Sequence, residues 1–129
     1  MKINTVEKWH ELVVAGDVAA LEDLLAENAV FHSPVVHSPQ VGKERTKMYL
    51  AAAFHVLADD SFTYIREVVS ETDAVLEFEV EIDGLLVNGV DMIRWDKSGR
   101  ITDFKVMLRP LKAINLIHRK MAELLTVEK

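Results

Sequence analysis

The chain has 129 residues, half of them hydrophobic and 28% charged, with no cysteine and a formal net charge of −6. A chain of this length forms one domain, here residues 1–129, with a core that needs no disulfide or metal to hold it. The lack of cysteine excludes thiol nucleophiles and thiolate metal sites and is typical of a reducing compartment. The acidic balance argues against nucleic-acid binding, which depends on Lys and Arg.

No apolar run approaches the roughly 20 residues that a membrane-spanning helix needs. The N-terminal segment turns acidic and amphipathic where a signal peptide would need an uninterrupted apolar stretch. We therefore expect a cytoplasmic protein with neither a nucleic-acid nor a membrane partner.

The first half of the chain has mainly the spacing of helices, with apolar residues three or four positions apart. Gly16 is a typical residue after a helix end, whereas Pro34 and Pro39 exclude a helix between them. The predicted elements are helices at about 4–15 and 18–27, a short strand at 29–32, a loop or edge strand with the two prolines, and a helix at about 42–57.

The second half has the alternation of antiparallel strands followed by one amphipathic helix. The predicted strands are at about 62–71, 74–83, 85–95 and 100–109, and the helix is at about 111–125. The fold class is therefore α+β, with helices that cover one face of a meander sheet.

A two-residue turn at Asp83-Gly84 sets the register of the two central strands, because a hairpin loop fixes which residues stand opposite each other. It places Asp91 opposite Leu76, on the apolar face of the sheet. The next turn, at 96–99, would place Asp91 opposite Phe104, unless a bulge at Gly99 flips the last strand.

A turn at Thr72-Asp73 predicts the register of the first strand of the meander. It places Glu67 opposite Phe78 and Ile65 opposite Val80, all on the apolar face. On the other face, Arg66 then lies beside Glu79, and charges of opposite sign alternate across neighbouring strands.

Asp91 is the first candidate functional residue, because a carboxylate among apolar side chains is costly unless it is protonated, paired or beside a cavity. Burial would raise its pKa toward the range of a general acid or base. Gly89, on the same face, would leave space for a ligand. The alternative is that Asp91 binds a backbone amide or an arginine and only fixes its strand.

Three segments carry a family resemblance: Phe31-His32-Ser33-Pro34, the helix start at Gly42, and the turn sequence at 94–101. With the order of elements, they make the chain similar to the SnoaL-like branch of the nuclear-transport-factor-2-like superfamily. The resemblance implies a curved sheet wrapped by helices into a cone (the cystatin-like roll), an apolar pocket, commonly a homodimer through the outer sheet face, and no cofactor.

Enzymes of this superfamily, such as ketosteroid isomerase and limonene-epoxide hydrolase, share an inward carboxylate that acts on an apolar cyclic substrate. Asp91 matches the strand position where several keep this acid. The sequence departs from two specific patterns. Arg94 lies on the face opposite Asp91, whereas the hydrolase has an Arg-x-Asp arrangement. Trp9 and His10 stand where ketosteroid isomerase has a tyrosine on its first helix.

Further candidates have a structural reading as well as a functional one. His32, near the mouth of the cone by resemblance, could exchange a proton with Asp91 or could bind the adjacent loop backbone. His37 has no ligand spacing with His32, so no metal site is predicted. His10, His55 and His118 are interpreted as surface or packing residues. The candidate ligand-binding residues are Glu67, Trp9, Phe31, Tyr49, Phe54, Phe78, Trp95 and Phe104.

These features predict a dimeric, small-molecule pocket protein without a cofactor, whose ligand is apolar or cyclic. If it is an enzyme, Asp91 acts as general base or acid with help from His32, in an isomerisation, cyclisation, dehydration or hydrolysis. The alternative is a non-catalytic ligand-binding or interaction module in which Asp91 is structural.

Overall fold

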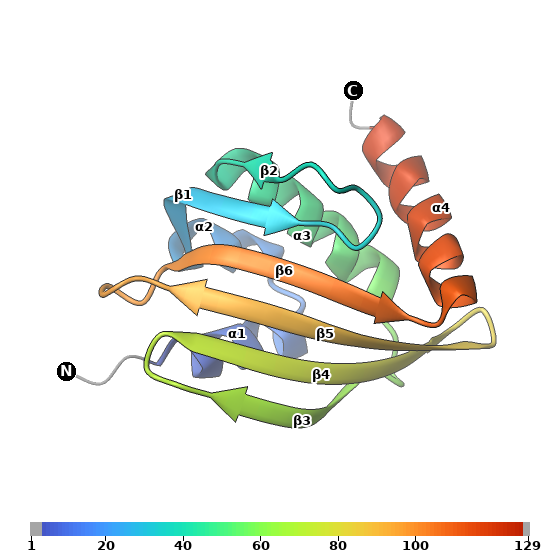
Figure 1. Cartoon of the computed structure of the whole chain (residues 1–129), viewed down its shortest axis with the longest axis horizontal. Helices are drawn as coiled ribbons and strands as arrows, with labels where there is room; N and C mark the ends of the chain where they lie inside the picture. The colour runs from blue at the N-terminus through green and yellow to red at the C-terminus, as the bar shows by residue number, and fades with distance from the viewer. Residues whose placement is uncertain (1–3, 128–129) are drawn as a thin grey trace.

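In a computed structural model, which describes residues 4–127, six strands form one curved sheet in the order β2-β1-β6-β5-β4-β3 (Figure 1). The helical elements are α1 (Thr5–Ala15), the 3-10 turn η1 (Val18–Ala20), α2 (Leu21–Leu24), α3 (Lys43–Leu57) and α4 (Leu111–Val127). The strands are β1 (Leu25–His32), β2 (Gln40–Val41), β3 (Thr63–Val69), β4 (Asp73–Ile82), β5 (Leu85–Trp95) and β6 (Ile101–Arg109). This architecture confirms the predicted α+β fold.

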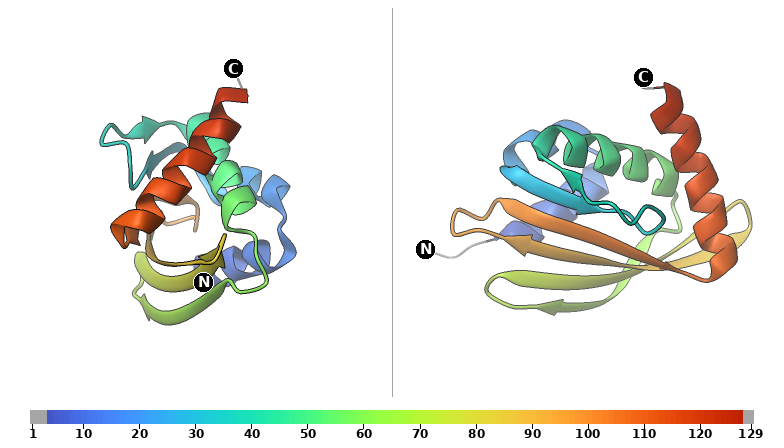
Figure 2. Two further views of the ribbon diagram at one scale, coloured as in Figure 1. Left: turned by 90° about the vertical axis from the view of Figure 1, so that its right-hand side faces the viewer. Right: turned by 45° about the horizontal axis from the view of Figure 1, so that its top comes forward.

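The sheet curves around the helices, and α3 and α4 lie on its concave side (Figure 2). Two groups of buried side chains fill the space between the layers. One is centred on Trp9 and Phe104, under α1 and α3. The other joins Phe78 and Val80 to Ile117 of α4. None of the helices in residues 4–127 is both long and apolar enough to cross a membrane.

The predicted second helix, at 18–27, is wrong in its last three residues. The helix ends at Leu24, and the chain continues as β1 from Leu25. β1 pairs in parallel with β6, where Leu25 stands opposite Ile101 and Phe31 opposite Phe104. This pairing joins segments far apart in the sequence, so tertiary contacts override the local helical spacing.

The hairpin of β4 and β5 confirms the predicted register. Asp83 and Gly84 form the turn with positive φ angles of 52° and 78°, as a two-residue hairpin loop requires. Leu76 stands opposite Asp91, and Ile82 opposite Leu85.

The other two hairpins keep the predicted faces near Asp91 and Glu67 but shift the partners. Asp91 stands opposite Val106 rather than Phe104, which instead pairs with Ile93. Glu67 stands opposite Leu76 rather than Phe78. Each strand is displaced by two residues, and such a shift returns every side chain to the same face.

A bulge between Tyr64 and Arg66 changes the face of the first residues of β3. Tyr64, rather than Ile65, turns toward the concave side, and it pairs with Phe78. The predicted inward position of Ile65 is therefore wrong, and 48% of its surface is exposed. Arg66 stands opposite Glu77, not Glu79, and forms an ion pair with it at 3.1 Å.

Candidate functional site

A cavity of about 800 Å³ lies between the concave face of the sheet and α1, α3 and α4. The loop at 33–36 and the end of α3 with the following residues, 57–60, also contribute to its wall. Most lining side chains are aliphatic or aromatic. Six of the predicted aromatic residues line it, and their part in binding stays a prediction: Trp9, Phe31, Tyr49, Phe54, Phe78 and Phe104.

Asp91 lies on the cavity wall, although only 6% of its surface is exposed. Its neighbour is Tyr64, whose hydroxyl lies 2.7 Å from Asp91 Oδ2. The indole Nε1 of Trp9 donates a hydrogen bond to the same hydroxyl at 2.9 Å. β5, β3 and α1 thus each supply one member of a continuous polar chain in an otherwise apolar wall.

Burial raises the pKa of Asp91 from 3.8 to about 7, and the hydrogen bond with Tyr64 opposes this rise. In residues 4–127, no Lys, Arg or His forms an ion pair with the Asp91 carboxylate. Burial, and then the nearby charge of Asp91, hold the pKa of Tyr64 well above its ordinary value. The phenol therefore stays protonated, while Asp91 exchanges a proton near neutral pH.

The number of protons on Asp91 and Tyr64 decides what the two side chains can do. The neutral pair has two acidic protons, of which one forms the hydrogen bond between them. Trp9 already donates to the phenol oxygen, so the second proton is free for a ligand oxygen. The ionised pair has one proton, which the hydrogen bond uses. Protonated Asp91 thus makes the pair a hydrogen-bond donor toward the cavity.

Tyr64 was missed by the sequence reasoning, because the bulge in β3 is not marked by Gly or Pro. One signal could have found it. Phe62 and Tyr64 are two positions apart, so they share a face of an extended strand, and both line the cavity. Glu67 lies three positions after Tyr64, so a regular strand would turn the two side chains to opposite faces. If both are expected to point inward, the strand must contain a bulge between them.

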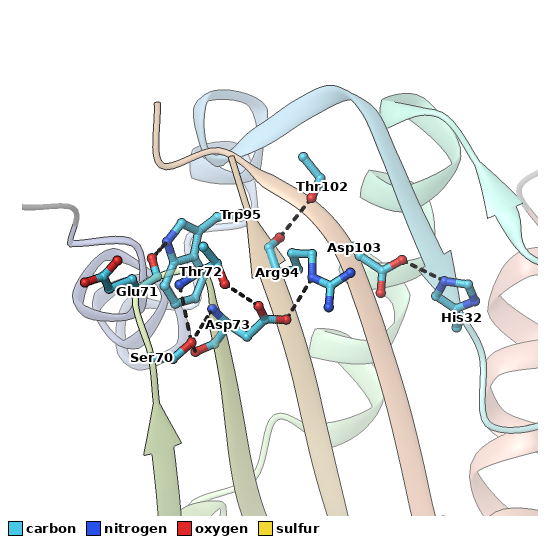
Figure 3. Close-up of polar contacts among 9 residues, drawn as sticks. All are labelled: His32, Ser70, Glu71, Thr72, Asp73, Arg94, Trp95, Thr102 and Asp103. Carbon is cyan, nitrogen blue, oxygen red and sulfur yellow. Dashed lines mark hydrogen bonds and ion pairs between the residues drawn. The ribbon is translucent and has the colours of Figure 1, made fainter. Parts of the chain in front are cut away.

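Trp95 and Glu67, two of the predicted ligand-binding residues, are not on the cavity wall. The Trp95 indole donates a hydrogen bond to the Glu71 carbonyl at 2.9 Å and closes the end of the β3–β4 turn (Figure 3). Glu67 Oε2 instead lies 2.7 Å from Nε2 of His10.

His32 lies on the other side of the sheet from Asp91, so its placement does not support proton exchange between them. His32 Nε2 is 2.8 Å from Oδ1 of Asp103 on β6 (Figure 3). Asp103 stands opposite Arg94, which forms an ion pair with Asp73 on the outer face. Phe31, the preceding residue, points inward, and alternation along β1 turns His32 outward.

Gly89 does not leave space for a ligand, as its position beside Asp91 had suggested. A Cβ at Gly89 would lie 2.3 Å from Cζ of Phe78 and 2.8 Å from Cδ2 of Leu108. The missing side chain therefore makes room for the Phe78 ring, which stacks on Phe62 with a centroid distance of 5.1 Å.

No group of three or more His, Cys, Asp or Glu side chains in residues 4–127 is placed to hold a metal ion. The polar side chains on the cavity wall include acids, hydroxyls and imidazoles. Apart from the chain of Trp9, Tyr64 and Asp91, the titratable side chains on its wall are His10, Tyr49, Asp59, Asp60 and His118.

Comparison with solved structures finds close relatives of this fold. A steroid delta-isomerase from Pseudomonas aeruginosa is 36% identical, with a TM-score of 0.90 over 96% of this chain and 90% of that chain. An uncharacterized protein with a cystatin-like fold from Silicibacter pomeroyi DSS-3 is 29% identical, with a TM-score of 0.86 over 94% of this chain and 84% of that one.

A more distant structure is the epoxide hydrolase/cyclase-like enzyme SalBIII of pyran ring formation in salinomycin. It is 18% identical, with a TM-score of 0.65 over 81% of this chain and 88% of that chain, and this likeness shows the fold alone. Among curated protein sequences, no significant match is found. The model of the SnoaL-like domain matches residues 6–104. The chain therefore belongs to the SnoaL-like domain family.

Proposed function

We propose that this protein is a cofactor-free enzyme that moves a proton within an apolar cyclic carbonyl compound. The observation that carries this proposal is the buried Asp91–Tyr64 pair on the wall of an apolar cavity. The pair offers a ligand oxygen one proton, and the surrounding aromatic side chains fit a ring system.

The similarity to the steroid delta-isomerase from Pseudomonas aeruginosa favours one reaction class for this protein. In this class, a carbon–carbon double bond migrates into conjugation with a ketone. In such a reaction a base removes a proton from the carbon next to the carbonyl, and the electron pair moves onto the carbonyl oxygen. The Asp91–Tyr64 pair donates to this oxygen as its charge develops. Return of the proton to the far end of the double bond restores the ketone, and nothing is oxidised or reduced.

Asp91 acts in this proposal as the general acid or hydrogen-bond donor. A low-polarity environment that keeps a carboxylic acid neutral lets it donate to an oxyanion. Tyr64 supplies the second proton of the pair, and Trp9 fixes the phenol by donating to its oxygen. The apolar walls exclude water, which strengthens these interactions.

An isomerisation assay tests the proposal directly. The substrate is the β,γ-unsaturated isomer of androstenedione, whose ultraviolet absorbance rises as the ketone becomes conjugated. Asp91→Asn should lower kcat by roughly 10²–10³-fold, because an amide is a weaker hydrogen-bond donor to the developing oxyanion than a neutral carboxylic acid. Asp103→Asn, on the outer face, is the matched control and should keep the wild-type rate.

Wild-type protein that binds the steroid without isomerising it would favour the non-catalytic ligand-binding module instead. Turnover that survives in Asp91→Asn would contradict the proposed role of this side chain. Binding is followed separately, by quenching of tryptophan fluorescence, so that loss of the ligand is not mistaken for loss of chemistry.

We also propose that two copies associate through the outer face of the sheet. Five apolar side chains on this face are exposed: Val68, Val75, Leu86, Met92 and Met107. Val68, Val75 and Met92 stand side by side in one row across β3, β4 and β5. Exposed apolar patches of this kind typically mark protein interfaces. Sedimentation should show a dimer that Met92→Glu weakens, whereas a wild-type monomer at high concentration would contradict the proposal.

A further inference from the structure

His10 lines the cavity next to the Asp91–Tyr64 pair. It follows Trp9 on α1, and its Nε2 lies 2.7 Å from Oε2 of Glu67 on β3. The two side chains are about one third exposed, at 33% and 34%. Glu67 is not on the cavity wall, so the carboxylate stands behind an imidazole that reaches the cavity.

Tyr64 connects this second pair to the first. The His10 ring packs edge-on against the Tyr64 ring, with a centroid distance of 5.2 Å and an interplanar angle of 71°. The hydroxyl of the same phenol is bound to Asp91. A ligand that lies along Tyr64 therefore has the acidic pair at one end of the phenol and the imidazole beside its ring.

We propose that His10, oriented by Glu67, is the second proton-transfer residue of this cavity and serves as the base for the carbon acid. This inference rests on the proposed function and names the group that the Asp91–Tyr64 pair lacks. A carboxylate that engages one imidazole nitrogen orients the ring and stabilises the imidazolium that forms on protonation. Glu67 is accordingly a positioning residue.

The step moves one proton from one carbon to another and leaves the enzyme unchanged. Nε2 of His10 faces Glu67, so Nδ1 takes the proton from the carbon next to the carbonyl. The C–H electron pair forms the new carbon–carbon double bond, and the carbonyl electrons move onto the oxygen that the Asp91–Tyr64 pair binds. The imidazolium then returns the same proton to the far carbon, and the enzyme regains its starting protonation.

The other titratable groups on the wall are less suited to this role. Asp59 accepts hydrogen bonds from its own loop, including Ser61 N–H at 2.8 Å, which hold its pKa below the ordinary value. Asp60 belongs to the same loop and His118 to α4. Tyr49 lies on α3. Among the described residues, none of these three side chains forms an ion pair with a carboxylate such as the one between His10 and Glu67.

The test uses His10→Gln and Glu67→Gln in the steroid isomerisation assay. His10→Gln should lower kcat by roughly 10²–10⁴-fold and leave the binding of androstenedione nearly unchanged, because the ring acts on the transition state. Glu67→Gln should lower kcat by about 10-fold, as expected of a side chain that orients another. His55→Gln, an exposed histidine on α3, is the matched control and should keep the wild-type rate.

Chemical rescue separates a proton-transfer role from a structural one. Added imidazole should restore part of the activity of His10→Ala, because the truncated side chain leaves an opening beside Tyr64 at a position that is about one third exposed. Thermal melting of each variant checks that it is folded. A folded His10→Ala that imidazole does not rescue overturns the inference.

Two further outcomes distinguish this inference from the proposed function. If Asp91→Asn loses turnover while His10→Gln keeps it, the role of His10 is overturned and the proposed function stands. If the wild-type protein does not isomerise the steroid, the proposed function fails, and the role of His10 fails with it.

Discussion

Two histidine–carboxylate pairs lie on opposite faces of the sheet and differ in what surrounds them. His10 and Glu67 are 2.7 Å apart beside the cavity, and His32 and Asp103 are 2.8 Å apart on the outer face. His10 of the first pair contacts Tyr64, whereas His32 of the second lines a small hollow with Lys105 and Met107. The composition of such a pair therefore does not indicate function until its face is known.

The aspartates of the two faces differ in the same way. Burial raises the pKa of Asp91 to about 7. On the outer face, a hydrogen bond from Thr72, together with Arg94, holds the pKa of Asp73 below its ordinary value. Of these two aspartates, only Asp91 has a pKa raised toward neutral pH, and four predictions test the difference between the faces.

The largest effect is expected from the pH dependence of stability in Asp91→Asn. Below about pH 4 the Asp91 carboxyl is protonated in both folded and unfolded chains, so burial carries no ionic cost. As the pH rises from 3.8 to about 7, only the unfolded chain ionises, and the folded state loses stability. The shift corresponds to about 4 kcal/mol.

Asparagine does not titrate. The unfolding free energy of Asp91→Asn minus that of wild type should therefore increase by about 4 kcal/mol between about pH 4 and pH 8. Urea denaturation at several pH values measures this difference. Asp73→Asn, on the outer face, should show the opposite dependence, and only below about pH 4, because the pKa of Asp73 in the folded chain lies below 3.8. A difference for Asp91→Asn that does not change with pH would mean that the buried acid has an ordinary pKa.

The next largest effect is expected from Gly89→Ala. The new methyl group would lie 2.3 Å from the Phe78 ring, which itself packs on Phe62. Overpacking of this kind should cost about 3 kcal/mol. The reciprocal double variant, Gly89→Ala with Phe78→Leu, should regain part of the loss. Wild-type stability of Gly89→Ala in thermal melting would contradict the packed arrangement.

Tyr64→Phe should cost about 2 kcal/mol, because it leaves the Trp9 N–H without its acceptor in the core. It should also raise the pKa of Asp91 further, since the Tyr64 hydrogen bond opposes the effect of burial. Chemical denaturation measures the first effect, and NMR titration of the Asp91 carboxyl measures the second. An unchanged or lower pKa in Tyr64→Phe would disprove the coupling of the two groups.

The smallest effect is expected from His32→Gln on the outer face. Its partner Asp103 is more than one third exposed, and exposed ion pairs contribute about 1 kcal/mol or less. Stability should therefore change by at most about 1 kcal/mol, and steroid isomerisation should stay at the wild-type rate. Strong loss of activity in His32→Gln, with the fold intact, would remove the distinction between the two faces.

The sequence predicts best where the structure depends on local contacts. The Asp83-Gly84 turn is a sufficient signal for the register of β4 and β5, and it places Asp91 correctly on the inner face. It predicts less well where distant segments decide the structure. β1 begins at Leu25 because it pairs with β6, and no local pattern encodes this contact.

The site was only partly predictable for the same reason. Asp91 follows from alternation along one strand, whereas Tyr64 reaches it only through the bulge in β3. His10 was interpreted as a surface or packing residue of its helix, and its position beside Tyr64 depends on how α1 packs against the sheet. His32 was assigned to the cavity by resemblance, although strand alternation turns it outward.

The pKa of Asp91 is the quantity on which the proposed chemistry depends most directly. It can be measured by following the side-chain carboxyl carbon in an NMR titration of the folded protein, with Asp91→Asn to assign the signal. A carboxyl that titrates near pH 7 is the predicted result, and it leaves the Asp91–Tyr64 pair with a proton to donate. A pKa at or below 3.8 would mean that Asp91 is ionised at neutral pH, which contradicts the proposed donor role.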